Sequence, residues 1–198
     1  MRRLTGTETV TDLDDYLTTV DAVGDETGCT VQVFDARYVI DETHLRRALT
    51  FADRAFTRGE NVARDRGVEI LLYAAGRRQI DRALEMGVSE GTLPVVALVA
   101  ADEGVVDETA TAETTADETA TAETTPDETA TADRDPDARE RRAVDRLRER
   151  SSFDPGTVAP ERDRVRAFFG VTDRELAATD GDLAALVHER VALLDVQK

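Results

Sequence analysis

The sequence predicts an α/β fold, a single layered domain in which helices pack on a mixed β-sheet and which a disordered acidic insert interrupts. Strand-like apolar runs alternate with amphipathic helical patterns, as is typical of layered α/β domains. Hydrophobic residues make up 40% of the 198 residues, enough to build a core. We expect residues 1–106 and 138–198 to form the two parts of this domain, on either side of an insert at 107–137.

Four stretches have the composition of β-strands, namely residues 3–7, 30–34, 68–73 and 93–100. The stretch 93–100 is almost wholly apolar, as in a strand that is buried on both faces. The stretch 68–73 runs through two alanines into Gly76. We therefore expect a buried strand to end there and a helix to begin directly after the glycine.

Helical periodicity occupies the intervals between these strands. The first helix is expected over residues 12–23, with Thr11 as its N-cap. Other helices are expected over residues 41–58, 77–86 with Gly87 as cap, 138–150, 161–169 and 182–194, the last capped by Asp180 or Asp182, and a short helical piece over 60–66.

The charge of the chain is strongly acidic, with 42 Asp and Glu against 25 Lys and Arg and a formal net charge of −17. Lysine occurs once, at Lys198. This composition indicates a halophile with a salty cytoplasm, where excess like charge keeps proteins soluble. The alternatives are an ordinary acidic protein or one that repels nucleic acid.

The insert explains most of this charge. The ten residues 107–116 recur at 117–126 with one change and start again at 127, and no large apolar side chain occurs in them. Such a repeat cannot build a core and is therefore expected to be disordered. Residues 107–137 carry −10 of the formal −17. The rest is only moderately acidic, so its charge does not exclude a nucleic-acid partner.

Several classes of protein are excluded. One cysteine, Cys29, allows no internal disulfide, and two histidines, His44 and His188, make no Cys/His metal cluster. The longest apolar run, residues 95–101, is too short to cross a bilayer, and no signal peptide is evident. Phosphate-binding, dinucleotide and serine-hydrolase motifs are absent. We expect a cytoplasmic protein with no cofactor, no bound metal and no catalytic residues.

The junction at Gly76 is the most informative local pattern. If a strand ends there and a helix begins with Arg77 and Arg78, both cations oppose the helix macrodipole unless an anion such as phosphate binds. The alternative is a pair of solvated arginines that interact with local acids such as Asp81.

The last helix carries a broad apolar stripe. Packing within its own domain and docking of a partner are both open, and a terminal helix can do both. The stripe and the arginine within its face are Leu183, Leu186, Val187, Arg190, Val191 and Leu194.

Several sequence blocks stand out together: they are Asn61-Val-Ala-Arg64, Glu69-Ile-Leu-Leu-Tyr73, Gly76-Arg-Arg-Gln-Ile80, Ala83, Met86-Gly-Val88, Val165-Arg-Ala-Phe-Phe-Gly-Val171 and the segment 183–196. With these blocks the chain resembles the TPRKB-like family of KEOPS complex accessory subunits, and its composition suggests an archaeal, haloarchaeal member. The resemblance covers about residues 1–106 and 157–198, and the acidic repeat falls in a variable region of the family.

The resemblance implies a non-enzymatic subunit of the machine that forms threonylcarbamoyladenosine beside the tRNA anticodon. Such a subunit binds the small kinase-like ATPase of the complex and helps to recruit tRNA through its 3′ CCA end. The last helix is then the candidate kinase contact. The candidate RNA-binding residues are Asn61, Arg64, Arg77, Arg78, Gln79 and Ile80.

Two other classes remain as alternatives. A stand-alone α/β regulator would hold a nucleotide or another small anion at the Gly76 junction and would need no protein partner. A small acid–base enzyme would use Asp35, Glu69 or His44 and show pH-dependent turnover.

Overall fold

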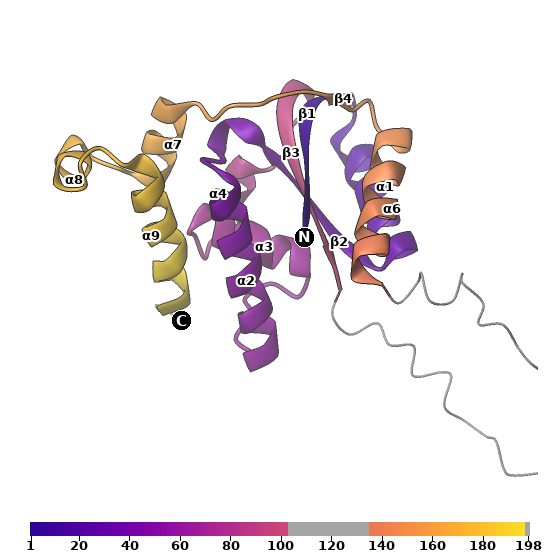
Figure 1. The fold of residues 1–198 in the computed structure, drawn as a ribbon, viewed down its shortest axis with the longest axis horizontal. Helices are drawn as coiled ribbons and strands as arrows, with labels where there is room; N and C mark the ends of the chain where they lie inside the picture. The colour runs from indigo at the N-terminus through magenta and orange to yellow at the C-terminus, as the bar shows by residue number, and fades with distance from the viewer. Residues whose placement is uncertain (103–134, 197–198) are drawn as a thin grey trace, which may run out of the picture.

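A four-stranded sheet lies at the centre of the molecule, in the order β2-β3-β1-β4 (Figure 1). The computed structural model describes residues 1–102 and 135–196. The strands are β1 (Arg2–Val10), β2 (Cys29–Asp35), β3 (Gly91–Ala101) and β4 (Asp154–Pro155). The layered α/β domain is confirmed. Every pairing among the described strands is antiparallel, however, so the sheet is not mixed.

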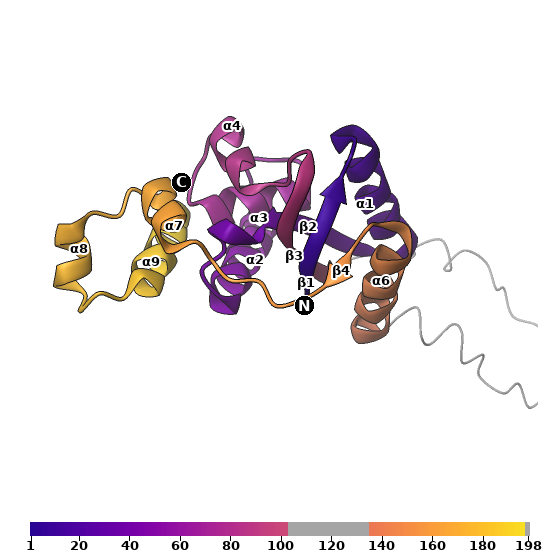
Figure 2. The same ribbon diagram turned by 90° about the horizontal axis from the view of Figure 1, so that it is seen from above.

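Helices cover both faces of the sheet (Figure 2). On one face lie α1 (Leu13–Thr27) and α6 (Pro136–Arg150). On the other lie α2 (Glu42–Arg58) and α3 (Arg66–Ala75). Beyond them α7 (Arg162–Phe169), α8 (Asp173–Ala178) and α9 (Leu183–Val196) form a further layer. The C-terminal helices were expected on the sheet, which is correct for α6, whereas α9 packs on α2 and α3.

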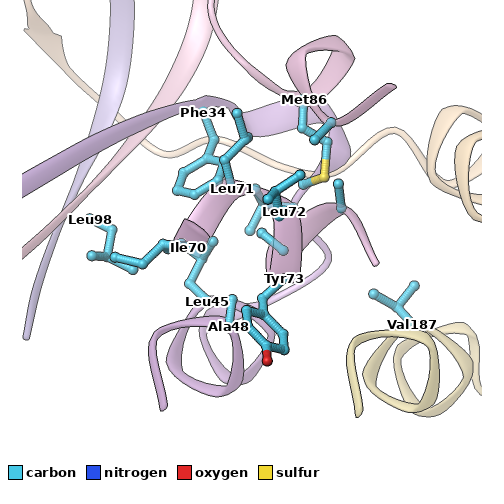
Figure 3. Close-up of a cluster of buried hydrophobic side chains, with 14 of the residues drawn as sticks. Phe34, Leu45, Ala48, Ile70, Leu71, Leu72, Tyr73, Met86, Leu98 and Val187 are labelled. Atoms are coloured by element: carbon cyan, nitrogen blue, oxygen red, sulfur yellow. The ribbon is translucent and has the colours of Figure 1, made fainter. Parts of the chain in front are cut away.

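Strand β3 is buried on both faces, as its apolar run predicts. Its alternate side chains divide between two cores because strand side chains point to opposite faces. Val95 and Ala97 belong to the cluster beneath α1 and α6. Val96 and Leu98 belong to the larger cluster that includes Phe34, side chains of α2 and α3, and Val187 of α9 (Figure 3).

The predicted strand at 68–73 is wrong, because these residues lie in α3. Asp65 caps the helix by accepting the Val68 N–H at 2.8 Å, and Gly76 ends it in the left-handed conformation with φ 59°. Nearly every side chain of α3 is buried between β2, α2 and α9, so the apolar residues run on without a helical period. A continuous apolar run does not distinguish a buried helix from a buried strand.

Other boundaries also differ from expectation. In place of the helix expected over 77–86, residues 77–79 are not helical, α4 is Ile80–Ala83 and a 3₁₀ turn follows at Leu84–Met86. Another 3₁₀ turn, Ala36–Tyr38, follows β2. No helix forms over 60–65, the N-cap of α1 is Asp12, and α8 was not expected. Because α6 begins at Pro136 with Asp135 as its cap, the end of the expected insert is helical. The repeat itself lies outside the described residues.

A strap over 151–161 connects α6 to α7 across the edge of the sheet. Within it, β4 pairs with β1 through Gly6↔Pro155 and Thr7↔Asp154. A Cβ at Gly6 would lie 2.2 Å from the Asp154 carbonyl oxygen and 2.7 Å from the Phe153 ring. Glycine at position 6 is therefore required for the strap to approach β1 this closely.

Candidate functional site

The junction after α3 is a helix C-terminus. Gly76 donates its N–H to the Tyr73 carbonyl and Arg77 donates its N–H to the Leu72 carbonyl, both at 3.0 Å, which closes the last turn. Arg77 and Arg78 therefore follow a negative helix end, where cations are favourable. The predicted turn from strand to helix is wrong, because residues 66–75 form a helix and the two arginines begin none. The arrangement that the anion-binding alternative required is therefore absent at this junction.

Arg77 has a structural contact. Its Nη2 donates to the Phe168 carbonyl oxygen at 2.6 Å, and its guanidinium carbon lies 5.7 Å from the centre of the Phe168 ring. This carbonyl belongs to the last turn of α7, so Arg77 satisfies an acceptor that the helix itself leaves open. The side chain thereby joins the α3–α4 connection to α7.

A polar cleft of about 350 Å³ lies beside this contact, between the α3–α4 connection, α4 and α7. Arg82 contributes a second guanidinium, which pairs with Glu85 at 3.1 Å, and Arg78 and Ile80 are exposed next to the cleft. Guanidinium groups beside an aromatic ring suit a phosphate and a stacked base. The lining residues are Arg77, Gln79, Arg82, Glu85, Ala167 and Phe168.

The remaining RNA candidates lie elsewhere. Asn61 and Arg64 precede α3, whereas residues 77–80 follow it, and a ten-residue helix of about 15 Å separates the two groups. Asn61 donates from Nδ2 to the Ala63 carbonyl at 2.8 Å, while Arg64 is exposed. The structure thus places Arg77 and Gln79 in the lining of the cleft, with Arg78 and Ile80 as their neighbours in the chain, and it places Asn61 and Arg64 at the opposite end of α3.

The apolar stripe of α9 is packed within this chain. Leu183, Leu186, Val187, Val191 and Leu194 are all buried, with Val187 and Val191 0% exposed. Arg190 pairs with Glu175 of α8. The hydrogen bonds that Glu175 accepts from the Thr172 backbone and side chain, and after them the contact with Arg190, lower the pKa of Glu175 to about 2. The stripe is therefore core, and these side chains present no surface to a partner.

The outer side of α9 was not singled out from the sequence. Leu193 is 36% exposed and Val196 79% exposed, and Ala185 and Ala192 lie between the buried positions. Glu189 lies one turn before Leu193 on the same side, so the outer side of α9 carries apolar side chains around an exposed carboxylate.

The candidate acid–base residues each have structural partners. His44 is fully buried, donates from Nε2 to the Ala74 carbonyl at 2.7 Å and accepts the Ile40 N–H at Nδ1. Burial lowers the pKa of His44 to about 4, so its neutral form connects α2 to α3. The Asp35 carboxylate accepts a hydrogen bond from the Arg37 guanidinium at 2.6 Å, and the Glu69 carboxylate accepts the backbone N–H groups of residues 62 and 63.

The part of the chain that the structure describes contains no helix long and apolar enough to span a membrane. Within residues 1–102 and 135–196, no group of three or more His, Cys, Asp or Glu side chains is placed to hold a metal ion.

The surface thus has exposed apolar side chains on α9 and a polar cleft, whereas His44, Asp35 and Glu69 make structural contacts. A family model described as kinase binding protein CGI-121 matches residues 9–195. The chain therefore belongs to this kinase-binding family, which is the TPRKB family, an accessory and not a catalytic family. No curated protein matches the chain.

Proposed function

We propose that this chain is the KEOPS subunit that binds the small kinase-like ATPase and helps to recruit tRNA, by its 3′ CCA end, for threonylcarbamoyladenosine formation. Membership of a kinase-binding family supports the first part. The observation that carries the proposal is the outer face of α9, where Leu193 and Val196 remain exposed on a helix whose opposite side is core.

The kinase contact is assigned to the outer side of α9 and to the neighbouring part of α2. The Phe51 ring is stacked on Tyr73, whose hydroxyl donates to Asp195 of α9 at 3.2 Å, and Arg54 lies 5.5 Å from the Phe51 ring centre. These contacts join α2, α3 and the end of α9 into one rigid surface. An apolar centre with arginine and aromatic groups at its side has the composition of a protein interface.

Amide hydrogen exchange tests this assignment. Adding the kinase in multi-molar potassium chloride is expected to slow exchange over residues 183–196 and 47–54 and to leave α1 and α6 unchanged. Protection confined to α1 or α6 would contradict the assignment.

The tRNA contact is assigned to the cleft between α4 and α7. Arg77, Arg82 and the Phe168 ring line it, and the exposed Arg78 and Ile80 flank the lining residue Gln79 in the chain. An incoming strand would therefore meet guanidinium groups, an apolar side chain and the ring together. Stacking and forked hydrogen bonds suit a salty cytoplasm, because salt weakens the counterion-release contribution to RNA affinity.

Charge reversal at the cleft tests this contact. Arg78→Glu together with Ile80→Glu is expected to weaken tRNA binding about tenfold or more, since one apolar contact and one charged contact are lost. Kinase binding is expected to stay intact. Arg148→Glu on α6, which also reverses an exposed arginine, is the matched control. Equal loss of tRNA and kinase binding in the cleft variant would indicate a structural role instead.

The cellular setting is also part of the proposal. Near-absence of lysine and excess acid support a cytoplasmic protein of a halophilic archaeon. A nucleotide-binding regulator is the weaker candidate, because the turn from strand to helix on which it depended does not exist.

A further inference from the structure

A row of two arginines and two aromatic rings continues from the α4–α7 cleft, and we name it the arginine–aromatic row. Arg77 and Phe168, which contact each other in the lining of the cleft, begin it. The Tyr38 ring lies 5.1 Å from the Phe168 ring, edge to face, and the guanidinium carbon of Arg164 lies 5.3 Å from the centre of the Tyr38 ring. Tyr38 and Arg164 are not among the residues that line the cleft, and the proposed kinase contact uses neither of them.

Three segments that are far apart in the sequence form the row. Tyr38 ends the 3₁₀ turn after β2, and Arg77 follows α3. Arg164 and Phe168 lie one turn apart on α7, so their side chains share a face of this helix. The N–H at the N-cap of α7 donates to the carbonyl of Arg37 at 3.0 Å, which fixes the start of α7 beside the 3₁₀ turn. The row is therefore a product of tertiary packing.

Both guanidinium groups are held in place beside their rings. Arg77 donates from Nη2 to the Phe168 carbonyl at 2.6 Å, and Arg164 donates from Nε to the Glu161 carboxylate at 2.8 Å. Among the described residues, neither Nη1 of Arg77 nor Nη2 of Arg164 has a hydrogen-bond partner. These N–H groups remain available to an incoming acceptor, and the two arginines lose little side-chain freedom when it binds.

The row reaches the molecular surface. Tyr38 and Phe168 are half-buried, and the Arg164 side chain is 35% exposed. A ring with a guanidinium group beside it offers a flat, cationic surface on which any base can stack. The carboxylate that contacts the row, that of Glu161, is paired with Arg164, so the row keeps the positive charge of Arg77. This composition suits an unpaired nucleotide, which has both a flat base and a phosphate.

We propose that the arginine–aromatic row binds unpaired nucleotides of the same RNA, next to those that enter the cleft. This inference rests on the proposed tRNA contact and deepens it, because it assigns the form of RNA that the site selects, a single-stranded end longer than the cleft alone takes. Stacking tolerates every base, so the row distinguishes unpaired from paired nucleotides and not one sequence from another. A protein partner fits less well, since the row continues a polar cleft and not the apolar side of α9.

RNA hairpins with unpaired 3′ ends test the row, with the full chain in multi-molar potassium chloride. One hairpin ends in unpaired CCA alone, and a second carries two further unpaired adenosines before the CCA. The longer end is expected to bind about tenfold more tightly, which corresponds to about 1.4 kcal/mol and to one stacked base. A third hairpin with abasic nucleotides in place of the two adenosines keeps the charge and is expected to bind like the short one.

Variants locate the contact. Tyr38→Ala with Arg164→Ala is expected to remove the tenfold gain and to leave affinity for the short end within about twofold. Arg164→Lys keeps the charge but not the planar group and should lower the gain to about threefold, whereas Tyr38→Phe keeps the ring and should keep the gain. Arg162→Ala, at an exposed arginine of the same helix outside the row, is the matched control. Thermal unfolding checks that each variant is folded.

The results separate this inference from the proposed function. Equal binding of the short and long ends, a gain that survives abasic nucleotides, or a gain that survives in the folded row variants would overturn the inference and leave the tRNA contact in place. If neither hairpin binds, both are overturned. If the Tyr38→Ala, Arg164→Ala variant loses the kinase and keeps the gain, the row is a protein contact and the inference is wrong.

Discussion

The two sides of the sheet differ in how they treat buried polar groups. On the side of α2, α3 and α9, His44 and Glu69 are buried with their hydrogen bonds made, and they tie helices and loops to one another. On the side of α1 and α6, Glu8 of β1 is 1% exposed and both of its carboxylate oxygens lack a hydrogen-bond partner. The first side is therefore a rigid base for the surfaces that we assign to kinase and tRNA, whereas the second contains a local source of instability.

The largest effect is expected where α9 joins the first side. Val187→Glu places a carboxylate at a position that is 0% exposed among apolar neighbours, and should cost about 4 kcal/mol or more of unfolding free energy. Leu193→Glu, on the outer side of the same helix, should change stability by about 0.5 kcal/mol or less. Denaturant unfolding measures both changes in unfolding free energy. Similar losses in the two variants would show that positions 187 and 193 do not differ in burial.

His44 provides a pH test of the first side. Because its folded pKa of about 4 lies below its ordinary value of 6.5, the unfolded chain takes up the proton first as pH falls. Stability should therefore decrease between pH 6.5 and pH 4, by about 3 kcal/mol in total from this group. Urea titrations across this range measure the effect, and His44→Gln should flatten it. An unchanged slope in the variant would show that another group is responsible.

Gly6 tests the strap that connects the two sides. Gly6→Ala places a methyl group 2.2 Å from a backbone oxygen of the strap, so β4 must move away, at a cost of about 2 kcal/mol. Gly156→Ala is the matched control, since no atom lies within 4 Å of its added Cβ. Thermal unfolding compares the two, and equal melting temperatures would mean that the strap is not held by β1.

Glu8 gives the smallest effect, and it has the opposite sign. Burial raises the pKa of this carboxyl, so its contribution to stability falls as pH rises through the raised value. Glu8→Gln should therefore stabilise the chain by about 1 kcal/mol at pH 7 and remove this part of the pH dependence. Glu189→Gln, which makes the same change at an exposed position of α9, is the control. If Glu8→Gln destabilises the chain, the carboxylate has a stabilising partner in solution.

The sequence predicts elements well where one side of an element is exposed. The amphipathic patterns of α2, α6 and α7 are confirmed. The strand predicted from the apolar run of β3 is confirmed too, although this strand is buried on both faces. The error at α3 has a physical cause, because neighbours on every side remove the polar face that defines a helical period. The two caps could have identified this run as a helix. Asp65 and Gly76 are typical residues for a helix start and a helix end, and both flank the run in the sequence.

The candidate site could be predicted only in part. Arg77 and Gln79 do line one cleft, but Phe168, which shapes it, comes from α7 some ninety residues later in the chain. Tertiary packing places that ring, and no local pattern predicts it. On α9, the sequence pattern identified the buried stripe, whereas the exposed Leu193 and Val196 are a second face that the same pattern contains.

Binding of the kinase tests the central claim most directly. The chain and the small KEOPS kinase-like ATPase are mixed in multi-molar potassium chloride, and the mass of the product is measured by light scattering. We expect a stoichiometric complex that is lost in the Leu193→Glu, Val196→Glu double variant and kept in Leu17→Glu, an exposed leucine on α1. No complex with the unmodified chain, or a complex unaffected by the double variant, would contradict the account.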